Sequence, residues 1–212
     1  DIVGEGAMNA AFVPVFTEYR EKESEADFRN LLSSAMGTMA LVLMVLSVAG
    51  VFLVPALIQA VDTLRVFTGA APRAHEDLQI AARLARWTFP YLFFIGMTVF
   101  AMGPLFTLRR YAAPSWSPCL LNIAIILCCL LFRDGLPWIG GDPAWALVAG
   151  VWLGGITQFA LLQHALWKHS GVWRPSFRLA HPGVKRIMLL MGPVIIGQAA
   201  GEVNKLADTL FA

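Results

Sequence analysis

Hydrophobic residues dominate the chain in long stretches that are separated by clusters of charge. Arg29 and Asp62 enclose 32 residues without any Asp, Glu, Lys or Arg. Three more charge-free stretches follow, of 22, 22 and 25 residues, at 87–108, 111–132 and 143–167. About 20 mostly apolar residues in a helix cross the hydrocarbon core of a bilayer, so each stretch is long enough to span a membrane. The pattern predicts an all-α fold, a polytopic transmembrane helical bundle.

About six helices are expected, and both ends of the chain read as the interiors of helices. We therefore expect the first and last helices to be truncated and the chain to be a piece of a longer membrane protein. Polar connections are expected at 19–30 and 62–80. The predicted spans are 2–18, 31–61, 83–108, 114–132, 143–167 and 187–212.

Lys and Arg are distributed unevenly between the two sides of this predicted bundle. One set of loops carries ten of them and the opposite set carries five. Cytoplasmic loops of membrane proteins hold the excess of positive charge, so the first set is expected to face the cytoplasm. The ten residues are Arg20, Lys22, Arg29, Arg109, Arg110, Lys168, Arg174, Arg178, Lys185 and Arg186.

Composition and motifs exclude several classes of protein. Hydrophobic residues make up 58% of the chain and charged residues only 14%, with a net charge of +2, which argues against a soluble domain, a disordered chain or a nucleic-acid partner. Cys119, Cys128 and Cys129 lie in one apolar run without a CxxC spacing, so neither a disulfide framework nor a zinc site is expected. No HExxH, GxSxG or Walker motif occurs, so we expect no enzyme, no metal and no bound cofactor.

The last helix carries an unusual polar stripe. With a helical advance of about 100° per residue, every polar side chain after Gly197 falls within an arc of about 160°. Ionisable groups at membrane depth usually face a bundle interior or a water-filled cavity. Two alternatives remain open: the charges pair along the helix at i,i+3 spacing, or this end lies at the outer interface. The candidate cavity residues of the stripe are Gln198, Glu202, Asn204, Lys205 and Asp208.

The first helix adds a second polar face. Glu5 and Asn9 are spaced i,i+4, so they also are candidates for lining a cavity; the alternative is that Glu5 hydrogen-bonds a neighbouring helix and only determines packing. Proline and glycine inside helices mark points of bending. The candidate bending residues are Pro14, Gly192, Gly197 and Gly201.

Three segments carry a resemblance to a known family. The opening segment 4–19 contains EGA, then AFVPV and EY, and it resembles a signature of the MurJ (MviN) lipid II flippases. A second match begins at Phe89-Pro90-Tyr91 and runs to Asn122, and a third is Met191-Gly192-Pro193 with Asn204 and Asp208. The resemblance implies a multi-pass protein of the bacterial inner membrane, in the multidrug/oligosaccharidyl-lipid/polysaccharide exporter superfamily. The chain, 1–212, would form a partial N-terminal lobe of a two-lobe transporter.

The family's activity is then the expected function. Such proteins flip lipid II, the lipid-linked peptidoglycan precursor, from the cytoplasmic to the periplasmic leaflet by alternating access, for cell wall synthesis. The expected partners are lipid II and membrane lipids, and coupling to an ion or to the membrane potential stays open. The resemblance implies that Glu5, Asn204 and Asp208 line the family's cavity. Glu202 and Lys205 are candidates only because they belong to the polar stripe of the last helix. The alternatives are another exporter of the superfamily, for polysaccharide lipid intermediates or drugs, and a non-transporting membrane scaffold.

Overall fold

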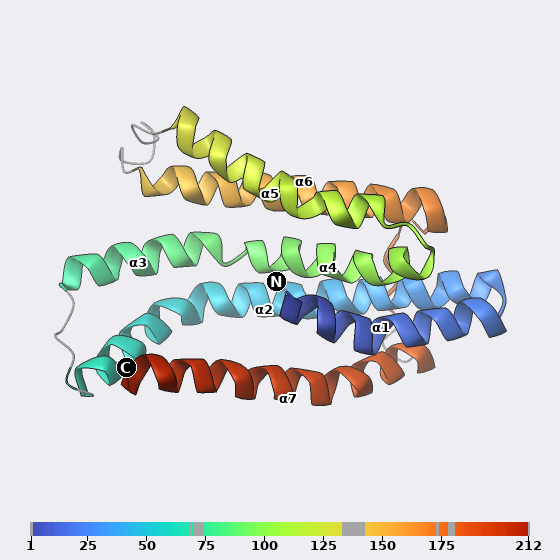
Figure 1. Cartoon of the computed structure of the whole chain (residues 1–212), viewed down its shortest axis with the longest axis horizontal. Coiled ribbons are helices and arrows are strands. Elements are labelled where there is room, and N and C mark those ends of the chain that lie inside the picture. The colour runs from blue at the N-terminus through green and yellow to red at the C-terminus, as the bar shows by residue number, and fades with distance from the viewer. Residues whose placement is uncertain are drawn as a thin grey trace. The chain divides into compact units, whose positions relative to one another are not determined.

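The structure is a computed structural model, and its described part is entirely α-helical apart from turns and short connections, which confirms the all-α prediction (Figure 1). It describes the backbone of residues 2–67, 69, 74–132, 143–172, 174–177 and 181–211, and within the helices it describes all side chains except those at 2–11, 194–195, 198, 202–204 and 206–211. The helices are α1 (Ile2–Lys22), α2 (Glu25–Phe67), α3 (His75–Thr88), α4 (Tyr91–Thr107), α5 (Ala112–Leu131), α6 (Ala144–Ser170) and α7 (Pro182–Phe211).

Among these helices, α2, α5 and α6 are each long and apolar enough to cross a membrane. The bent pair α3 and α4 meets the same criteria when it is taken as one span, with an angle of 40° between its halves. These spans identify a membrane protein. Helix α2 has 43 residues, which corresponds to a length of about 65 Å, roughly twice the thickness of the hydrocarbon core. Part of α2 therefore extends beyond the hydrocarbon.

The predicted loop at 19–30 is wrong, because α1 continues to Lys22 and α2 begins at Glu25. Ser24 ends the turn: its hydroxyl accepts a hydrogen bond from the Asp27 amide at 3.2 Å and donates to the Asp27 carboxylate at 2.6 Å. This is N-terminal capping by a serine side chain, which satisfies an amide that would otherwise lack a partner. Apart from Glu23, the charged residues of this segment are thus helical.

The predicted span at 83–108 is not one continuous helix, because it is divided into α3 and α4 at Phe89 and Pro90; as a bent pair these helices still meet the criteria for a single span. Proline has no amide hydrogen, so a helical hydrogen bond is missing at Pro90, which accounts for the break. Phe89 before it keeps right-handed helical angles. The polar connection expected at 62–80 is largely helical too, since α2 runs to Phe67 and α3 begins at His75.

Contacts group the chain into two compact units, and the boundaries between them fall inside α2, α4, α5 and α6. Unit 1 comprises Asp1–Val42, Gly96–Ser117 and Phe159–Ala212, and unit 2 comprises Leu43–Ile95 and Pro118–Gln158.

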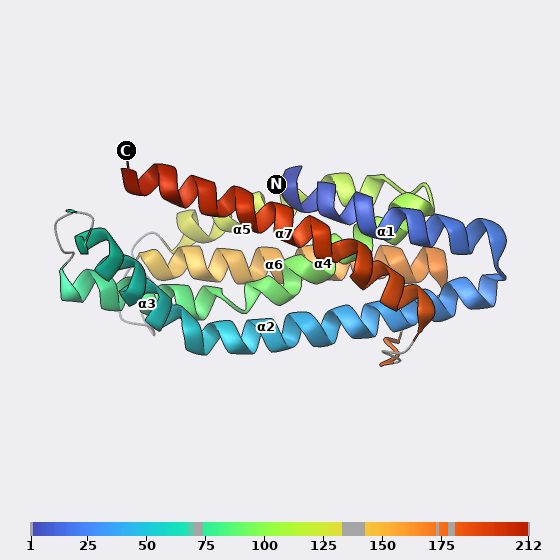
Figure 2. The same cartoon turned by 90° about the horizontal axis from the view of Figure 1, so that it is seen from below.

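The core of unit 1 is an aromatic cluster contributed by three helices. Phe12 and Phe16 of α1 are fully buried and meet Phe100 of α4 with ring centroids 5.5 and 6.3 Å apart. Phe28 of α2 meets Phe16 at 6.1 Å. The edge-to-face angles of these three contacts are the favoured geometry for aromatic pairs. The cluster holds α1 against α2 and α4, and α1 also packs along α7 (Figure 2).

Unit 2 depends on close approach between α5 and α6. A Cβ atom on Gly150 would lie 2.7 Å from the Cα of Ile125, and one on Gly154 would lie 2.9 Å from the Cα of Leu121. Real Cβ atoms are not found at such distances from backbone, so only glycine permits this spacing. Small residues allow membrane helices to pack backbone against backbone, and α5 and α6 use this means.

Candidate functional site

Lys205 is the residue of the predicted polar stripe on α7 whose side chain the structure describes, and this side chain is exposed. Gly197, Gly201 and Lys205 are spaced four residues apart, so they lie on one face of the helix, and all three are exposed. A Cβ atom on Gly192, Gly197 or Gly201 would meet no other atom within 4 Å. Ile196, Ala199 and Ala200 are exposed as well, so the described residues of this part of α7 are exposed on every side of the helix.

The other predicted cavity residues have backbones on α1 and α7, which the structure brings side by side. Their shared cavity stays a prediction, since these side chains lie outside the described residues. They are Glu5, Asn9, Gln198, Glu202, Asn204 and Asp208.

A small apolar cavity of about 160 Å³ lies between α1, α2 and α7 in unit 1. Met188, Met191 and Gly192 line it from α7, and Phe12 lines it from α1. The Thr38 hydroxyl also lines it but donates to the Ser34 carbonyl at 2.9 Å, so the cavity has little polar character. An apolar cavity of this kind does not hold a charged head group, but it leaves room for α7 to move at Gly192.

The beginning of α7 is attached to α1. The Arg186 guanidinium lies 2.8 Å from the Glu18 carboxylate. A Cβ atom on Gly183 would lie 2.6 Å from the Leu31 side chain and 3.1 Å from the Tyr19 hydroxyl, so the first turn of α7 approaches both neighbours closely. These contacts hold the start of α7 in place.

The segment between α6 and α7 is attached to α2 in a similar way. The Ser33 hydroxyl donates to the Arg174 carbonyl at 2.8 Å, and the Ser176 amide donates to the Ser33 carbonyl at 2.9 Å. A Cβ atom on Gly37 would overlap the Ser176 carbonyl oxygen. Glycine at position 37 is therefore required for this segment to lie against α2.

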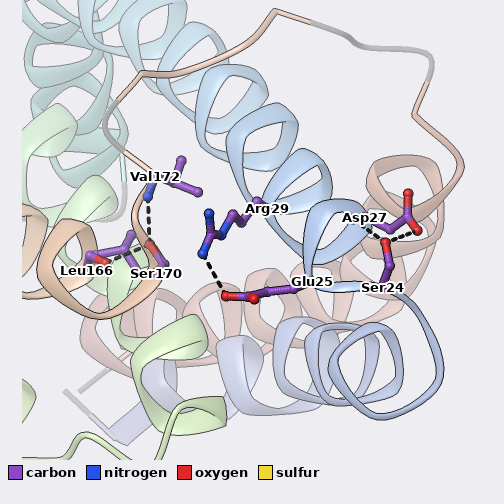
Figure 3. A network of polar contacts seen from close by, with 7 residues as sticks. All are labelled: Ser24, Glu25, Asp27, Arg29, Leu166, Ser170 and Val172. Carbon is purple, nitrogen blue, oxygen red and sulfur yellow. Dashed lines mark hydrogen bonds and ion pairs between the residues drawn. The ribbon is translucent and has the colours of Figure 1, made fainter.

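Figure 3 shows the polar contacts where α6 ends near the start of α2. Arg29 and Glu25 form an ion pair at 2.6 Å. The Ser170 hydroxyl accepts a hydrogen bond from the Val172 amide at 3.2 Å. Gly171 between them has a φ of +70°, a conformation that side chains rarely adopt, and it ends α6 beside Arg29.

Sequence reasoning missed these attachments because it expected a polar connection at 19–30 and because the contacts join segments that are distant in the sequence. Arg20 donates to the Thr107 carbonyl at the end of α4, and Glu18 binds both Lys22 and Arg186. One signal was present: Glu18 and Lys22 have the i,i+4 spacing typical of a continuing helix. The contacts with α4 and α7 have no local signal in the sequence.

Taken together, α7 has an attached beginning, an open later part, and Gly192 and Pro193 between the two. Proline inside a helix removes a backbone hydrogen bond and is a common site of kinks. The arrangement suits a helix whose outer part changes its angle while its first turns stay in place.

Comparison with known proteins agrees with this membrane architecture. A family model described as "Lipid II flippase MurJ" matches the whole chain, residues 1–212. The chain belongs to the MurJ family. The family resemblance inferred from the sequence motifs is thus confirmed.

Curated relatives support the assignment to the MurJ family. A probable lipid II flippase MurJ of Vibrio cholerae is 34% identical over 214 residues, covering 100% of this chain and 40% of the relative. One from Haemophilus influenzae is 32% identical and covers 100% of the chain and 41% of the relative. A lipid II flippase MurJ of Burkholderia cenocepacia is 30% identical, covering 98% of the chain and 39% of the relative. The chain thus spans about 40% of the length of these relatives.

The three segments that resemble the MurJ family have distinct places in the structure. In the opening segment, Phe12, Val15 and Phe16 are buried in unit 1, so this part of the motif is a packing element. The segment Phe89-Pro90-Tyr91 marks the break between α3 and α4, and Met191-Gly192 lines the apolar cavity. Pro14 is exposed on α1.

Proposed function

We propose that the protein containing this chain flips lipid II from the cytoplasmic to the periplasmic leaflet of the bacterial inner membrane, as a transporter that performs no covalent chemistry. The observation that carries the proposal is the match of the entire chain to the MurJ family, together with relatives that are named lipid II flippases. In this proposal the chain forms most of an N-terminal lobe, and a second lobe completes the transport pathway.

The chemistry of the substrate explains why a polar wall is needed. A pyrophosphate with attached sugars and peptide cannot enter hydrocarbon, because burying unpaired charge and unsatisfied polar groups costs many kcal/mol. The polar stripe of α7, on which Lys205 is exposed, supports a hydrated cavity at this place. The proposed lining comprises Glu5, Asn9, Gln198, Glu202, Asn204, Lys205 and Asp208.

Alternating access requires a moving element, and α7 is the one that the structure favours. Its first turns are attached through Arg186, and the apolar cavity beside Gly192 leaves space for a change of angle. Pro14, Gly197 and Gly201 are further proposed bending points. The proposal needs no bound cofactor; an ion gradient or the membrane potential would supply the energy.

The test is replacement of the essential flippase in growing bacteria by the protein that contains this chain. Survival and labelled lipid II on the outer leaflet are expected. Stable insertion into the membrane, measured in the same cells, separates loss of activity from loss of the protein. Death of the cells despite stable insertion contradicts the proposal. Export of a different lipid-linked polysaccharide instead would assign the protein to another branch of the superfamily.

A further inference from the structure

A second and larger cavity, of about 960 Å³, lies wholly within unit 2. Helix α3 and the C-terminal part of α2 form most of its wall, and Trp152 of α6 contributes as well. In Figure 1 the C-terminal part of α2 bends away from α3. Pro55 lies in this part of α2 and lines the cavity, and a proline within a helix explains a bend. The cavity is thus a consequence of the bent helix.

Two arginines give the cavity its electrostatic character. Arg83 and Arg86 lie one turn apart on α3, and both line the cavity. Neither forms a hydrogen bond or ion pair with any residue that the structure describes. The acidic residue in the wall, Asp62, is buried, and its carboxylate lies 4.0 Å from the Arg65 guanidinium, beyond hydrogen-bond distance. The cavity therefore has an excess of positive charge that the described protein does not neutralise.

The rest of the wall is mixed: aromatic and aliphatic side chains lie beside the polar side chains of Gln59, Thr63, His75 and Gln79. Trp87 and Trp152 line the cavity, and the Trp152 indole donates a hydrogen bond to the Trp87 carbonyl at 2.8 Å. Trp87 also contacts Trp145 edge to face, with ring centroids 6.2 Å apart. Tryptophans gather at the level of lipid head groups, where one side of the indole is apolar and the other is wet. Leu78 adds aliphatic surface beside them.

The adjoining surface of α2 shows at which depth the cavity lies. Leu53 and Leu57 are 57% and 58% exposed, as expected for side chains that face lipid tails, whereas the ring of Phe52 has the Arg86 guanidinium 5.8 Å from its centroid. One to three turns later, α2 reaches Asp62 and Arg65, which end the charge-free stretch. The cavity therefore lies where α2 passes from the hydrocarbon to the polar head groups.

We propose that this cavity binds an anionic phospholipid of the phosphatidylglycerol class. The phosphate diester lies between Arg83 and Arg86, and the first acyl carbons lie against Trp152 and Leu78. Guanidinium groups bind phosphate oxygens with paired, charge-assisted hydrogen bonds. A zwitterionic lipid brings its own ammonium group and gains less from two arginines. The inference does not depend on lipid II flipping, because binding is measured without transport.

The test is native mass spectrometry of the protein containing this chain, purified in detergent with equal amounts of phosphatidylglycerol and phosphatidylethanolamine. We expect phosphatidylglycerol to be bound in preference, and binding to fall by at least about tenfold in the double variant Arg83→Gln/Arg86→Gln. The control, Arg109→Gln/Arg110→Gln, removes the same charge from the connection between α4 and α5 and should retain the lipid. Equal losses in both double variants, or equal binding of the two lipids, would overturn the proposal.

A second measurement keeps both Arg83 and Arg86, so it does not depend on whether the arginine variant folds. Brominated phosphatidylglycerol should quench tryptophan fluorescence more strongly in the unmodified protein than in Trp152→Phe, and brominated phosphatidylethanolamine should not show this difference. Excess inorganic phosphate should leave the quenching unchanged. Displacement by phosphate alone, or by undecaprenyl pyrophosphate in preference to phosphatidylglycerol, would assign the cavity to another ligand and overturn the proposal.

Discussion

The guanidinium of Arg186, in the second turn of α7, lies 2.8 Å from the carboxylate of Glu18 near the end of α1. Both side chains are more than one-third exposed, at 56% and 36%, so water and salt screen the attraction. The contact thus orients two helices more than it stabilises the fold.

We expect a double-mutant cycle of Glu18→Gln and Arg186→Gln to give a coupling free energy of about 0.5 kcal/mol. The coupling should decrease as salt is added, because the pair is exposed. Chemical unfolding in detergent measures it. Lys22→Gln is the control, since Lys22 binds the same carboxylate at 3.8 Å. A coupling free energy of zero at low salt would contradict an ion pair between Glu18 and Arg186.

Gly37→Ala should destabilise the protein by roughly 1–3 kcal/mol, because the added methyl group overlaps the Ser176 carbonyl oxygen. Thermal unfolding followed by circular dichroism measures the change. Gly201→Ala is the matched control, because nothing lies within 4 Å of a Cβ atom there. The control should be neutral or more stable by up to about 1 kcal/mol, as alanine favours helix. Equal melting temperatures for the two variants would disprove the contact.

Gly50 faces the ring of Phe89, the residue that ends α3, and a Cβ atom at position 50 would overlap that ring. Gly50→Ala should therefore destabilise the protein by roughly 1–3 kcal/mol. A side chain is the obstacle, so Phe89→Leu in the Gly50→Ala background should recover part of the loss. The free energies of unfolding of the single and double variants test this. Additive losses would show that the two positions do not meet.

Cysteines placed singly at Glu202, Lys205 and Asp208 should react with membrane-impermeant thiol reagents if this face lines a hydrated cavity. The background replaces Cys119, Cys128 and Cys129 by alanine. Leu189→Cys is the control, because Leu189 is 71% exposed on an apolar part of α7 and should stay unreactive. Uniform protection at the three test positions would argue for a dry interface.

Gly192→Ile should fill part of the 160 Å³ apolar cavity and stiffen α7. We expect unfolding to be unaffected or slightly harder, and the appearance of lipid II on the outer leaflet to slow by at least about tenfold. Gly197→Ala, on the open face and away from this cavity, is the comparison and should slow transport less. Normal transport by Gly192→Ile would exclude a bend at this position.

The sequence was sufficient for the helical class, because a stretch such as 30–61 has few other ways to satisfy its backbone in lipid. It was insufficient for α3, whose charged residues resemble a loop and whose apolar residues pack only on one side. It also could not separate packing from function: Phe12 and Phe16 belong to the family motif, yet they form the core of unit 1. The cavity at Arg83 and Arg86 depends on contacts between α2, α3 and α6, which no local pattern encodes.

Only Glu23 and Ser24 separate α1 from α2. Two residues leave the helices of this hairpin little freedom to move independently. A tilt of α1 therefore also displaces the first turns of α2. Arg186 links the same corner to α7 through Glu18. A displacement of this corner would therefore move α1, α2 and α7 together. A small molecule bound there would restrict the movement of all three helices.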